Sequence, residues 1–226
     1  MAKAKKYVVL VADIVSSRNI NDRNDFQKKF SGVIQNLRDE EYRNNLFNRN
    51  SDLTSPFTVT LGDEYQAVYD RADNIFRDAF IIMEALHPIK TRFSYGIGTI
   101  ATDINKESAI GMDGEAFYNA RDGIDMLKDE ENKDNIFILR GLENKQQQEL
   151  YNNILYLISK SIKGWKINRS KIFGLRFAEY EPRYISELLD ITPQAIYKNI
   201  DVGNLDIIQN IFFNISESIN KYLEKI

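Results

Sequence analysis

The sequence predicts a mixed α/β domain over residues 1–142, followed by a smaller all-helical domain over residues 143–226. In the first part, short runs of β-branched residues alternate with amphipathic helical patterns, which is typical of α/β proteins. From Glu143 onward no further strand pattern follows, and the segment up to Lys160 is expected to form a helix that links the two parts. With 226 residues, of which 43% are hydrophobic, the chain can bury a sizeable core.

The first predicted strand carries an acidic residue at an unusual place. Tyr7–Ile14 is an almost continuous run of Val, Leu and Ile, the pattern of a strand that is buried on both faces. Asp13 interrupts this run, although an isolated carboxylate is costly to bury. An amphipathic helix is expected next, because apolar residues recur there at three- and four-residue spacing: Phe26, Phe30, Val33, Ile34 and Leu37.

A hairpin and two further strands complete the predicted sheet. The remaining strands are expected at Phe57–Leu61, Gln66–Tyr69, Arg92–Ile100 and Ile136–Leu139. The short connection at residues 62–65 suits a β-hairpin, and Pro56 is expected to open the strand before it. Helical patterns at Ile75–Leu86 and around Glu115–Lys128 separate the later strands. The resulting order, βαββαβαβ, predicts a ferredoxin-like sandwich of the palm type.

The composition excludes several classes of site. The chain has no cysteine, which rules out disulfide frameworks, thiolate zinc sites, iron–sulfur clusters and thiol nucleophiles. It has one histidine, His87, which precedes Pro88 and is interpreted as a helix-end residue. A metal would therefore be held by oxygen, which favours magnesium, calcium or manganese. Since the sequence shows neither a membrane-spanning run nor a signal peptide, we expect a cytoplasmic protein without a membrane partner.

Two acidic positions are expected to meet at one end of the sheet. In a sandwich of this order, the first strand and the hairpin lie side by side, which brings Asp13 close to Asp63. Two close carboxylates repel each other and are most easily kept ionised by a shared divalent cation. Glu64 is either a third metal ligand or points to the opposite side, because strand neighbours alternate. The alternative is that Asp13 caps a strand and Gly62-Asp63-Glu64 is an ordinary turn.

The residues after Asp13 have the character of a phosphate site. Ile14, Ser16, Ser17 and Arg18 offer backbone N–H groups, two hydroxyls and a guanidinium at the entrance to a predicted helix. Such a set can cradle a phosphate. The alternative is that one of the serines only caps the helix.

Four segments of the sequence resemble the successive blocks of class III nucleotidyl cyclases. They are Val11–Ser17, Leu61–Tyr69, Arg92–Gly98 and Gly114–Arg121. The hairpin also resembles that of GGDEF diguanylate cyclases, and with its helical C-terminal part the chain resembles the SatD family of bacterial proteins. By this resemblance, Asp13 and Asp63 correspond to the two metal-binding aspartates of the cyclases. The resemblance also implies Mg²⁺ or Mn²⁺, a nucleoside triphosphate or another nucleotide, and a homodimer that could complete the site.

The chain departs from the cyclase pattern at the positions that recognise the base and stabilise the transition state. Val59 stands where these enzymes usually have a lysine. Anchoring their Asn–Arg pair on Arg121 places Phe117 at the Asn position, and anchoring it on Asn119 places Gly123 at the Arg position, so neither register gives the pair. Arg121 then either meets a phosphate or pairs with a surface carboxylate. Three hypotheses remain open: a nucleotide-responsive DNA-binding regulator, an active two-metal nucleotidyl cyclase, or a non-catalytic binding module.

The C-terminal part resembles a helix-turn-helix over residues 182–200. A first helix is expected to end near Leu189, and Thr192 and Pro193 have the character of the cap and first turn of a second helix. The residues with the spacing to pack these helices together are Ile185, Leu188, Leu189, Ile191, Ala195, Ile196 and Ile200. The residues left facing outward, where a recognition helix presents base-reading groups, are Gln194, Tyr197, Lys198 and Asn199. The alternative is that the motif serves only for packing.

A basic stretch precedes this motif in a chain whose formal net charge is −3. Between Lys160 and Arg183, seven basic residues outnumber Glu179 and Glu181. The stretch either neutralises DNA phosphates or forms an ordinary solvated face. Trp165, which lies within it, is predicted to pack in the core or between the two parts.

Overall fold

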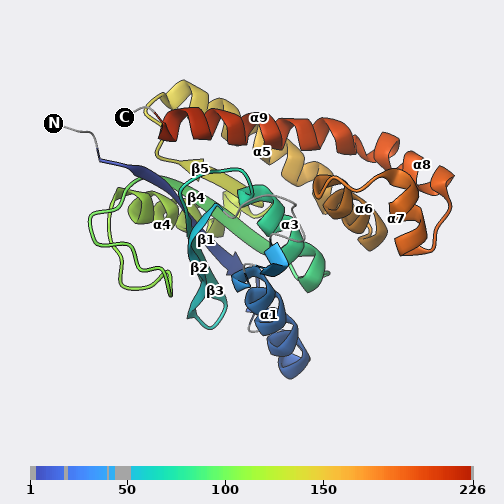
Figure 1. Ribbon diagram of the computed structural model, residues 1–226, viewed down its shortest axis with the longest axis horizontal. Coiled ribbons are helices and arrows are strands. Elements are labelled where there is room, and N and C mark those ends of the chain that lie inside the picture. Colours follow the sequence, from blue (N-terminus) through green and yellow to red (C-terminus); the bar gives the residue numbers. More distant parts are fainter. Residues whose placement is uncertain (1–3, 18–19, 40, 44–51, 225–226) are drawn as a thin grey trace.

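One five-stranded sheet organises the chain, and its strands follow the order β2-β3-β1-β4-β5 (Figure 1). The computed structural model describes residues 4–17, 20–39, 41–43 and 52–224. The strands are β1 (Lys6–Ile14), β2 (Leu53–Leu61), β3 (Glu64–Tyr69), β4 (Thr91–Thr99) and β5 (Phe137–Arg140). Neighbouring strands are antiparallel except β4 and β5, which are parallel. The prediction of a mixed α/β fold is confirmed.

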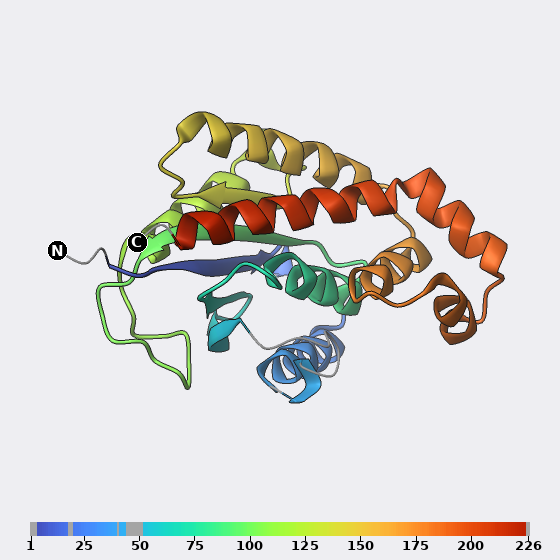
Figure 2. The same ribbon diagram turned by 45° about the horizontal axis from the view of Figure 1, so that its top comes forward.

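Helices pack on both faces of the sheet, and the alternation of side chains in β1 separates the two layers. The helices are α1 (Arg23–Arg38), α3 (Ile75–Leu86), α4 (Glu115–Lys128), α5 (Lys145–Lys163), α6 (Ile167–Phe177), α7 (Pro182–Leu189), α8 (Pro193–Gly203) and α9 (Leu205–Leu223). Val9 and Val11 face α4, whereas Val8 and Leu10 face the layer that contains α1, α3 and α9 (Figures 1 and 2). These four residues are at most 1% exposed, as expected of a strand covered on both sides.

The hairpin strands begin earlier than the sequence pattern indicates. β2 begins at Leu53, so Pro56 lies inside the strand and does not open it. The edge position of β2 and the register shifts around Ser55 and Thr58 allow this, because an edge strand tolerates a residue without an N–H group. β3 begins at Glu64, which makes Glu64 a strand residue and not part of the turn.

The two predicted parts share one continuous core. Phe212 of α9 is fully buried, and its ring contacts Phe76 and Phe80 of α3 and Phe137 of β5, at centroid distances of 4.5–5.6 Å. Trp165 is 8% exposed and packs against the ring of a neighbouring α6 residue, which confirms the prediction that it is a packing residue. The helices after residue 142 therefore cover the sheet and do not merely follow it.

Side chains of α5 form hydrogen bonds with backbone groups of β5 and of the residue before it. Asn152 accepts a hydrogen bond from the N–H of Leu139 (2.8 Å) and donates one to its carbonyl oxygen (3.0 Å). The hydroxyl of Ser159 accepts from the N–H of Ile136 (3.0 Å) in the same way. A helix thus occupies the place that a sixth strand would take (Figure 2).

A buried ionic network connects residue Arg43, which follows α1 in the chain, with the start of β2 and with α3. Arg43 and Asp78 are 1% and 0% exposed, and the guanidinium Nη1 donates to both oxygens of Asp78, at 2.8 and 2.7 Å. Tyr69 also donates to Asp78 (2.7 Å), while Arg43 Nη2 approaches Asp52 at 3.4 Å. Burial raises the pKa of the Asp52 carboxyl to about 6, and repulsion from Asp78 adds to the shift. The network fixes this connection to the core.

Helices α7 and α8 lie beyond one end of the sheet and are joined by a three-residue turn (Figure 2). Asp190 adopts the left-handed conformation after α7, and the Thr192 side chain accepts from the N–H of Ala195 (3.2 Å) at the start of α8. Ile185 and Ile196 are fully buried, as predicted. The prediction that Leu188 packs between the helices is wrong, since Leu188 is 54% exposed.

Candidate functional site

A row of charged side chains crosses three neighbouring strands at one end of the sheet. Asp13 of β1 pairs in register with Glu64 of β3 on one side and with Arg92 of β4 on the other. Directly opposite residues in a sheet project to the same face, so the three side chains lie together. Asp13 and Glu64 are only 8% and 4% exposed, although both are carboxylates.

Helix α4 adds two further cations from above this face. Arg121 Nη1 lies 2.6 Å from Glu64 Oε2, and Lys128 Nζ lies 3.3 Å from Asp13 Oδ1 and 3.7 Å from Glu64 Oε2. Arg121 and Lys128 are seven residues apart, which is two helical turns, so both project from one side of α4. Arg92 Nη1 completes the group at 3.5 Å from Asp13 Oδ2.

Glycine allows α4 to approach the sheet this closely. A Cβ atom at Gly96 of β4 would lie 2.2 Å from the carbonyl oxygen of Ala116 and from the backbone nitrogen of Ala120. Any larger residue at position 96 would push α4 away from β4. The glycine thereby sets the height at which Arg121 and Lys128 stand above the carboxylates.

Asp63 connects the hairpin turn to the end of β1 through two hydrogen bonds. Its carbonyl oxygen accepts from the N–H of Ile14 (3.1 Å), and its carboxylate accepts a hydrogen bond from the hydroxyl of Ser17. The predicted proximity of Asp63 to the end of the first strand is thus present, and Asp63 contributes a negative charge that acts on Asp13. We call Asp13, Asp63, Glu64, Arg92, Arg121 and Lys128 the strand-end site.

The electrostatics of Asp13 reflect its position inside this site. Burial raises the pKa of the Asp13 carboxyl, and the nearby charge of Asp63 acts in the same direction. The cations of Lys128 and Arg92 oppose the shift by stabilising the ionised form. An additional positive charge at this point would favour the carboxylate further, which is the property expected of a cation-binding oxygen group.

Ile14 and Ser16, two of the residues predicted to cradle a phosphate, lie at the end of β1 and in the turn after it, and not at the N-terminus of α1. Helix α1 begins only at Arg23, where Asp22 is the N-cap and its side chain accepts from the N–H of Asp25 (2.9 Å). The alternative that Ser16 or Ser17 caps this helix is therefore wrong. The N–H of Ile14 is already bonded to Asp63, while Ser16 is exposed and has a positive φ of 56°.

One member of the predicted phosphate cradle, Arg18, lies outside the described residues. For Arg121, the sequence left open a phosphate contact or a surface ion pair. The structure shows an ion pair, but its partner, Glu64, is a buried carboxylate and not a surface one.

The predicted metal ligands do not form a preformed cluster. Among the residues that the structure describes, no three or more acidic or histidine side chains are grouped closely enough to hold a metal ion. Asp13, Asp63 and Glu64 therefore do not provide a complete set of protein ligands for a metal ion. Magnesium, however, is often held by only one or two carboxylates and completes its shell with water and phosphate oxygens. The oxygen atoms of Asp13 and its neighbours fit that type of site.

Two members of the strand-end site were not predicted from the sequence. Arg92, the second residue of β4, lies directly opposite Asp13, and its proximity to Asp13 can be inferred only once the register of β1 and β4 is known. Lys128 stands at the last position of α4, two turns after Arg121. The seven-residue spacing between two basic residues is the signal that could have identified it.

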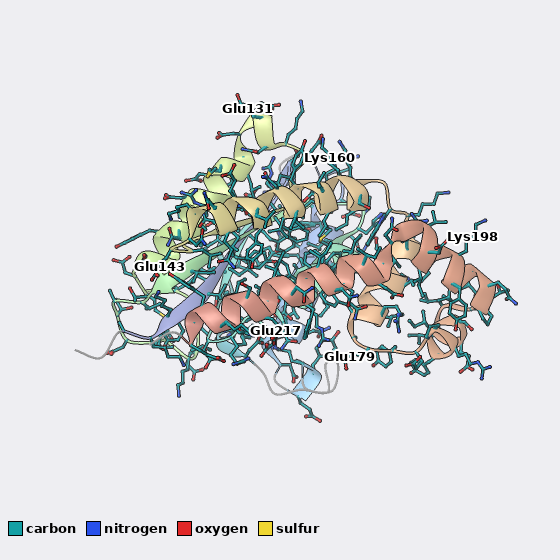
Figure 3. All side chains as sticks on the ribbon, turned by 90° about the horizontal axis from the view of Figure 1, so that it is seen from above. Glu131, Glu143, Lys160, Glu179, Lys198 and Glu217 are labelled. Atoms are coloured by element: carbon teal, nitrogen blue, oxygen red, sulfur yellow. The ribbon has the colours of Figure 1, made fainter. Side chains whose placement is uncertain are left out.

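The side chains predicted to contact DNA are only in part presented to solvent. Gln194, Tyr197 and Lys198 are exposed on α8, and Lys198 lies on the outer surface of the helical part (Figure 3). Asn199 is half-buried: its amide donates to the carbonyl oxygen of Ala195 (2.9 Å) and accepts from Arg169 Nε (3.3 Å). The prediction that Asn199 faces outward is therefore wrong.

Three of the seven basic residues in the predicted basic stretch form ion pairs within the chain. Lys160 and Lys163 both bind Asp134, and Arg176 pairs with Asp206 at 3.3 Å. These contacts correspond to the alternative of a solvated face with local ion pairs. In the described residues, no helix combines the length and apolar character that crossing a membrane requires.

Comparison with known proteins identifies a family but no characterised relative. No curated protein matches the sequence, and no solved structure does so either. The model of the SatD family matches residues 7–211, a segment that includes the sheet, the strand-end site and most of the C-terminal helices. The chain therefore belongs to the SatD family.

Proposed function

We propose that the protein binds a nucleotide together with Mg²⁺ or Mn²⁺ at the strand-end site, and that the C-terminal helices convert this binding into regulation of a DNA or other partner. The observation that carries the proposal is the alignment of Asp13 with Glu64 and Arg92 beneath Arg121 and Lys128. This juxtaposition concentrates three cations and nearly buried carboxylates at one end of the central strand.

The charges of the site suit a metal–phosphate complex. Carboxylate oxygens are the ligands that Mg²⁺ prefers, and arginine and lysine side chains bind phosphate oxygens. In the structure these groups neutralise one another, at distances from 2.6 to 3.7 Å. A bound cation would replace the positive charge beside the carboxylates and leave the basic side chains for the phosphates. Here Asp13, with Asp63 or Glu64, would hold the metal, and the metal would screen the phosphate charge.

The topology supports the comparison with palm-type domains. The strand that carries Asp13 is central, and the hairpin that carries Asp63 lies beside it, an arrangement that agrees with the proposed ferredoxin-like order. Binding is favoured over cyclase turnover because the chain's own α4 lacks the Asn–Arg pair. Asn119, the nearest amide, donates to the carbonyl oxygen of Ile97 (2.8 Å). A second copy of the chain in a homodimer is the source from which a missing group would come.

Replacing Asp13 tests the proposal directly. With MgCl₂ and ATP, GTP, CTP or UTP, we expect one nucleotide to stabilise the wild type, by about 2.7 kcal/mol at 100 times its Kd. Asp13→Asn should remove this stabilisation, because it deletes the charge that holds the metal. The measurement is thermal unfolding with and without EDTA, with Asp103→Asn, an exposed aspartate outside the site, as the control.

Three outcomes of this experiment separate the hypotheses. Stabilisation that persists in both Asp13→Asn and Glu64→Gln would contradict a metal–nucleotide site at the strand ends. If no nucleotide stabilised the protein, the nucleotide-binding hypotheses would be excluded and only the non-catalytic binding module would remain. Chromatography of the same samples would detect a cyclic product, which would show that the site also catalyses attack of a 3′-hydroxyl on the α-phosphate.

The exposed surface of α8 supports a DNA-binding role for the C-terminal part. α7, its three-residue turn and α8 have the lengths of a helix-turn-helix, and Thr192 caps the second helix. Gln194, Tyr197 and Lys198 project from its first two turns into solvent. Glutamine and lysine side chains are suited to base edges and phosphates in a major groove.

The DNA affinity of the protein, measured at several salt concentrations, tests this role. Fluorescence anisotropy with a random-sequence duplex should give an affinity that falls with salt, and the slope should decrease by about 1 for Lys198→Ala if that lysine contacts a phosphate. Gln194→Ala should weaken sequence preference more than affinity. Lys221→Ala, an exposed lysine on α9, is the control. Binding that is absent with and without nucleotide, or unchanged in Lys198→Ala, would contradict the role of α8.

A further inference from the structure

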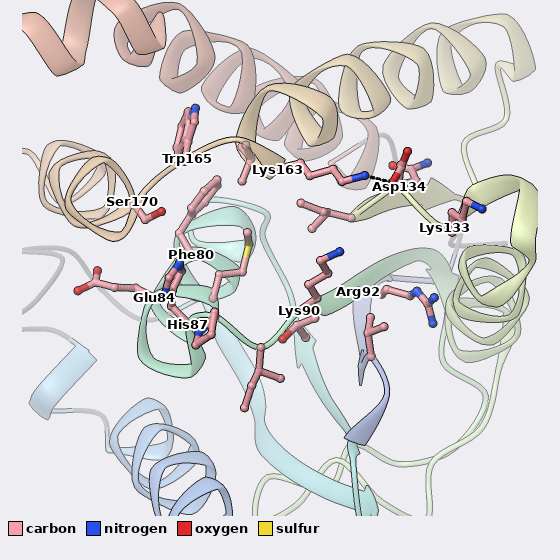
Figure 4. Close-up of a pocket in the computed structure, with 18 residues that line it drawn as sticks. Phe80, Glu84, His87, Lys90, Arg92, Lys133, Asp134, Lys163, Trp165 and Ser170 are labelled. Carbon is pink, nitrogen blue, oxygen red and sulfur yellow. Dashed lines mark hydrogen bonds and ion pairs between the residues drawn. The ribbon is translucent and has the colours of Figure 1, made fainter. Parts of the chain in front are cut away.

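A cavity lies where the sheet meets the C-terminal helices (Figure 4). It has a volume of about 150 Å³ and is bounded by the end of α3, the first residues of β4, the segment before β5, the end of α5 and the start of α6. Val15 and Arg92 also border it, so the cavity adjoins the strand-end site without sharing its carboxylates.

One wall of this cavity is apolar. It is formed by Phe80, Met83, Ile136, Ile162 and Trp165. Phe80 and Trp165 are 3% and 8% exposed and stand on the same side of the cavity (Figure 4). A space of about 150 Å³ is large enough for one benzene-sized group, and the apolar wall is the part of the cavity against which such a group would pack. The wall therefore matches a single aromatic ring or a short branched alkyl group.

The opposite side of the cavity is basic. Lys90 is exposed, and it makes no ion pair with the residues that the structure describes. In Figure 4 its side chain rises toward Lys163, whose ammonium group shares Asp134 with Lys160. The second carboxylate of the lining, Glu84, points away from Lys90 (Figure 4). A ligand group placed between Lys90 and Lys163 would meet positive charge.

We propose that this cavity binds a small anion that carries one ring-sized apolar group, such as an aryl phosphate or an aryl carboxylate. The ring would lie against Phe80 and Trp165, and the anionic group would accept hydrogen bonds from Lys90 and Lys163. The proposal does not depend on nucleotide binding at the strand-end site. Since β4, α5 and α6 all line the cavity, its ligand would bridge the sheet and the C-terminal helices.

The single tryptophan of the chain gives a specific test, because Trp165 lines the cavity. Phenyl phosphate is titrated into the full-length protein while tryptophan fluorescence is excited at a wavelength that phenyl phosphate does not absorb. We expect a saturable change. Benzyl alcohol, which lacks the charge, and inorganic phosphate, which lacks the ring, should each bind at least about tenfold more weakly, since a charge-assisted hydrogen bond and a buried ring each contribute that much or more.

Variants assign the signal to the cavity. Lys90→Gln should weaken phenyl phosphate about tenfold, whereas Lys166→Gln, an exposed lysine next to Trp165 but outside the cavity, should leave its affinity unchanged. Ile136→Phe should abolish binding by filling the apolar space. No saturable change, equal binding of benzyl alcohol or phosphate, or an unaltered affinity in Lys90→Gln would each overturn the proposal. The nucleotide experiment with Asp13→Asn is unaffected by any of these results.

Discussion

Replacing Arg43 by methionine should lower the free energy of unfolding by about 3–5 kcal/mol. The substitution keeps an apolar side chain of similar length, but it leaves the carboxylate of Asp78 buried at 0% exposure without the guanidinium that donates two hydrogen bonds to it. Asp52, which lies at the other end of the network, loses the same cation. Urea denaturation followed by circular dichroism measures the loss.

Two comparisons make this result specific to the buried pair. Arg71→Met removes surface ion pairs with Asp73 and Glu224, and should cost no more than about 1 kcal/mol. Adding Asp78→Asn to Arg43→Met should recover part of the stability, because the uncompensated charge is gone. An Arg43→Met variant as stable as Arg71→Met would show that the network does not hold the fold.

Phe212→Ala should destabilise the protein by about 3–5 kcal/mol and should do so in a single unfolding transition. The ring of Phe212 is fully buried against Phe76 and Phe137, so its removal leaves a cavity between α9 and the sheet. The fluorescence of Trp165, which reports on the helical part, and the far-ultraviolet signal of the whole chain should change together. Coincident transitions indicate one cooperative unit.

The neighbouring residue provides a matched control. Phe213 is 54% exposed, and Phe213→Ala should change the stability by about 0.5 kcal/mol or less. If instead Phe212→Ala separated the fluorescence and circular dichroism transitions, the two parts would be independent domains, as the boundary at residue 142 predicts.

The strands were the most predictable feature because their hydrophobic runs are dictated locally. The run Tyr7–Ile14 contains a complete buried strand, and its bounds are confirmed within one residue. The strand-end site was harder to predict because it depends on register. Nothing local in the sequence shows that Glu64 and Arg92 stand opposite Asp13, and both residues acquire their roles from pairing between strands.

For the helical part, the sequence predicts the helices but not their packing partners. Its helices were predictable from their apolar periodicity, since a stripe at 3.6-residue spacing implies that one face is buried. The stripe does not identify what covers it. The sequence therefore does not predict that Phe212 packs among the rings of α3 and β5. It predicts that Leu188 packs between two helices, whereas Leu188 is exposed in the structure.

The hydrogen bonds from α5 to the strand beside it have a consequence for self-association. A strand at the border of a sheet normally offers free backbone groups that can recruit a strand from another molecule. Asn152 and Ser159 occupy those groups on Leu139 and Ile136, so a second chain cannot extend the sheet there. The other edge strand of the sheet is β2, and there Pro56 and the irregular register oppose the addition of a strand from another molecule. The fold is thereby protected against fibrillar assembly on both sides.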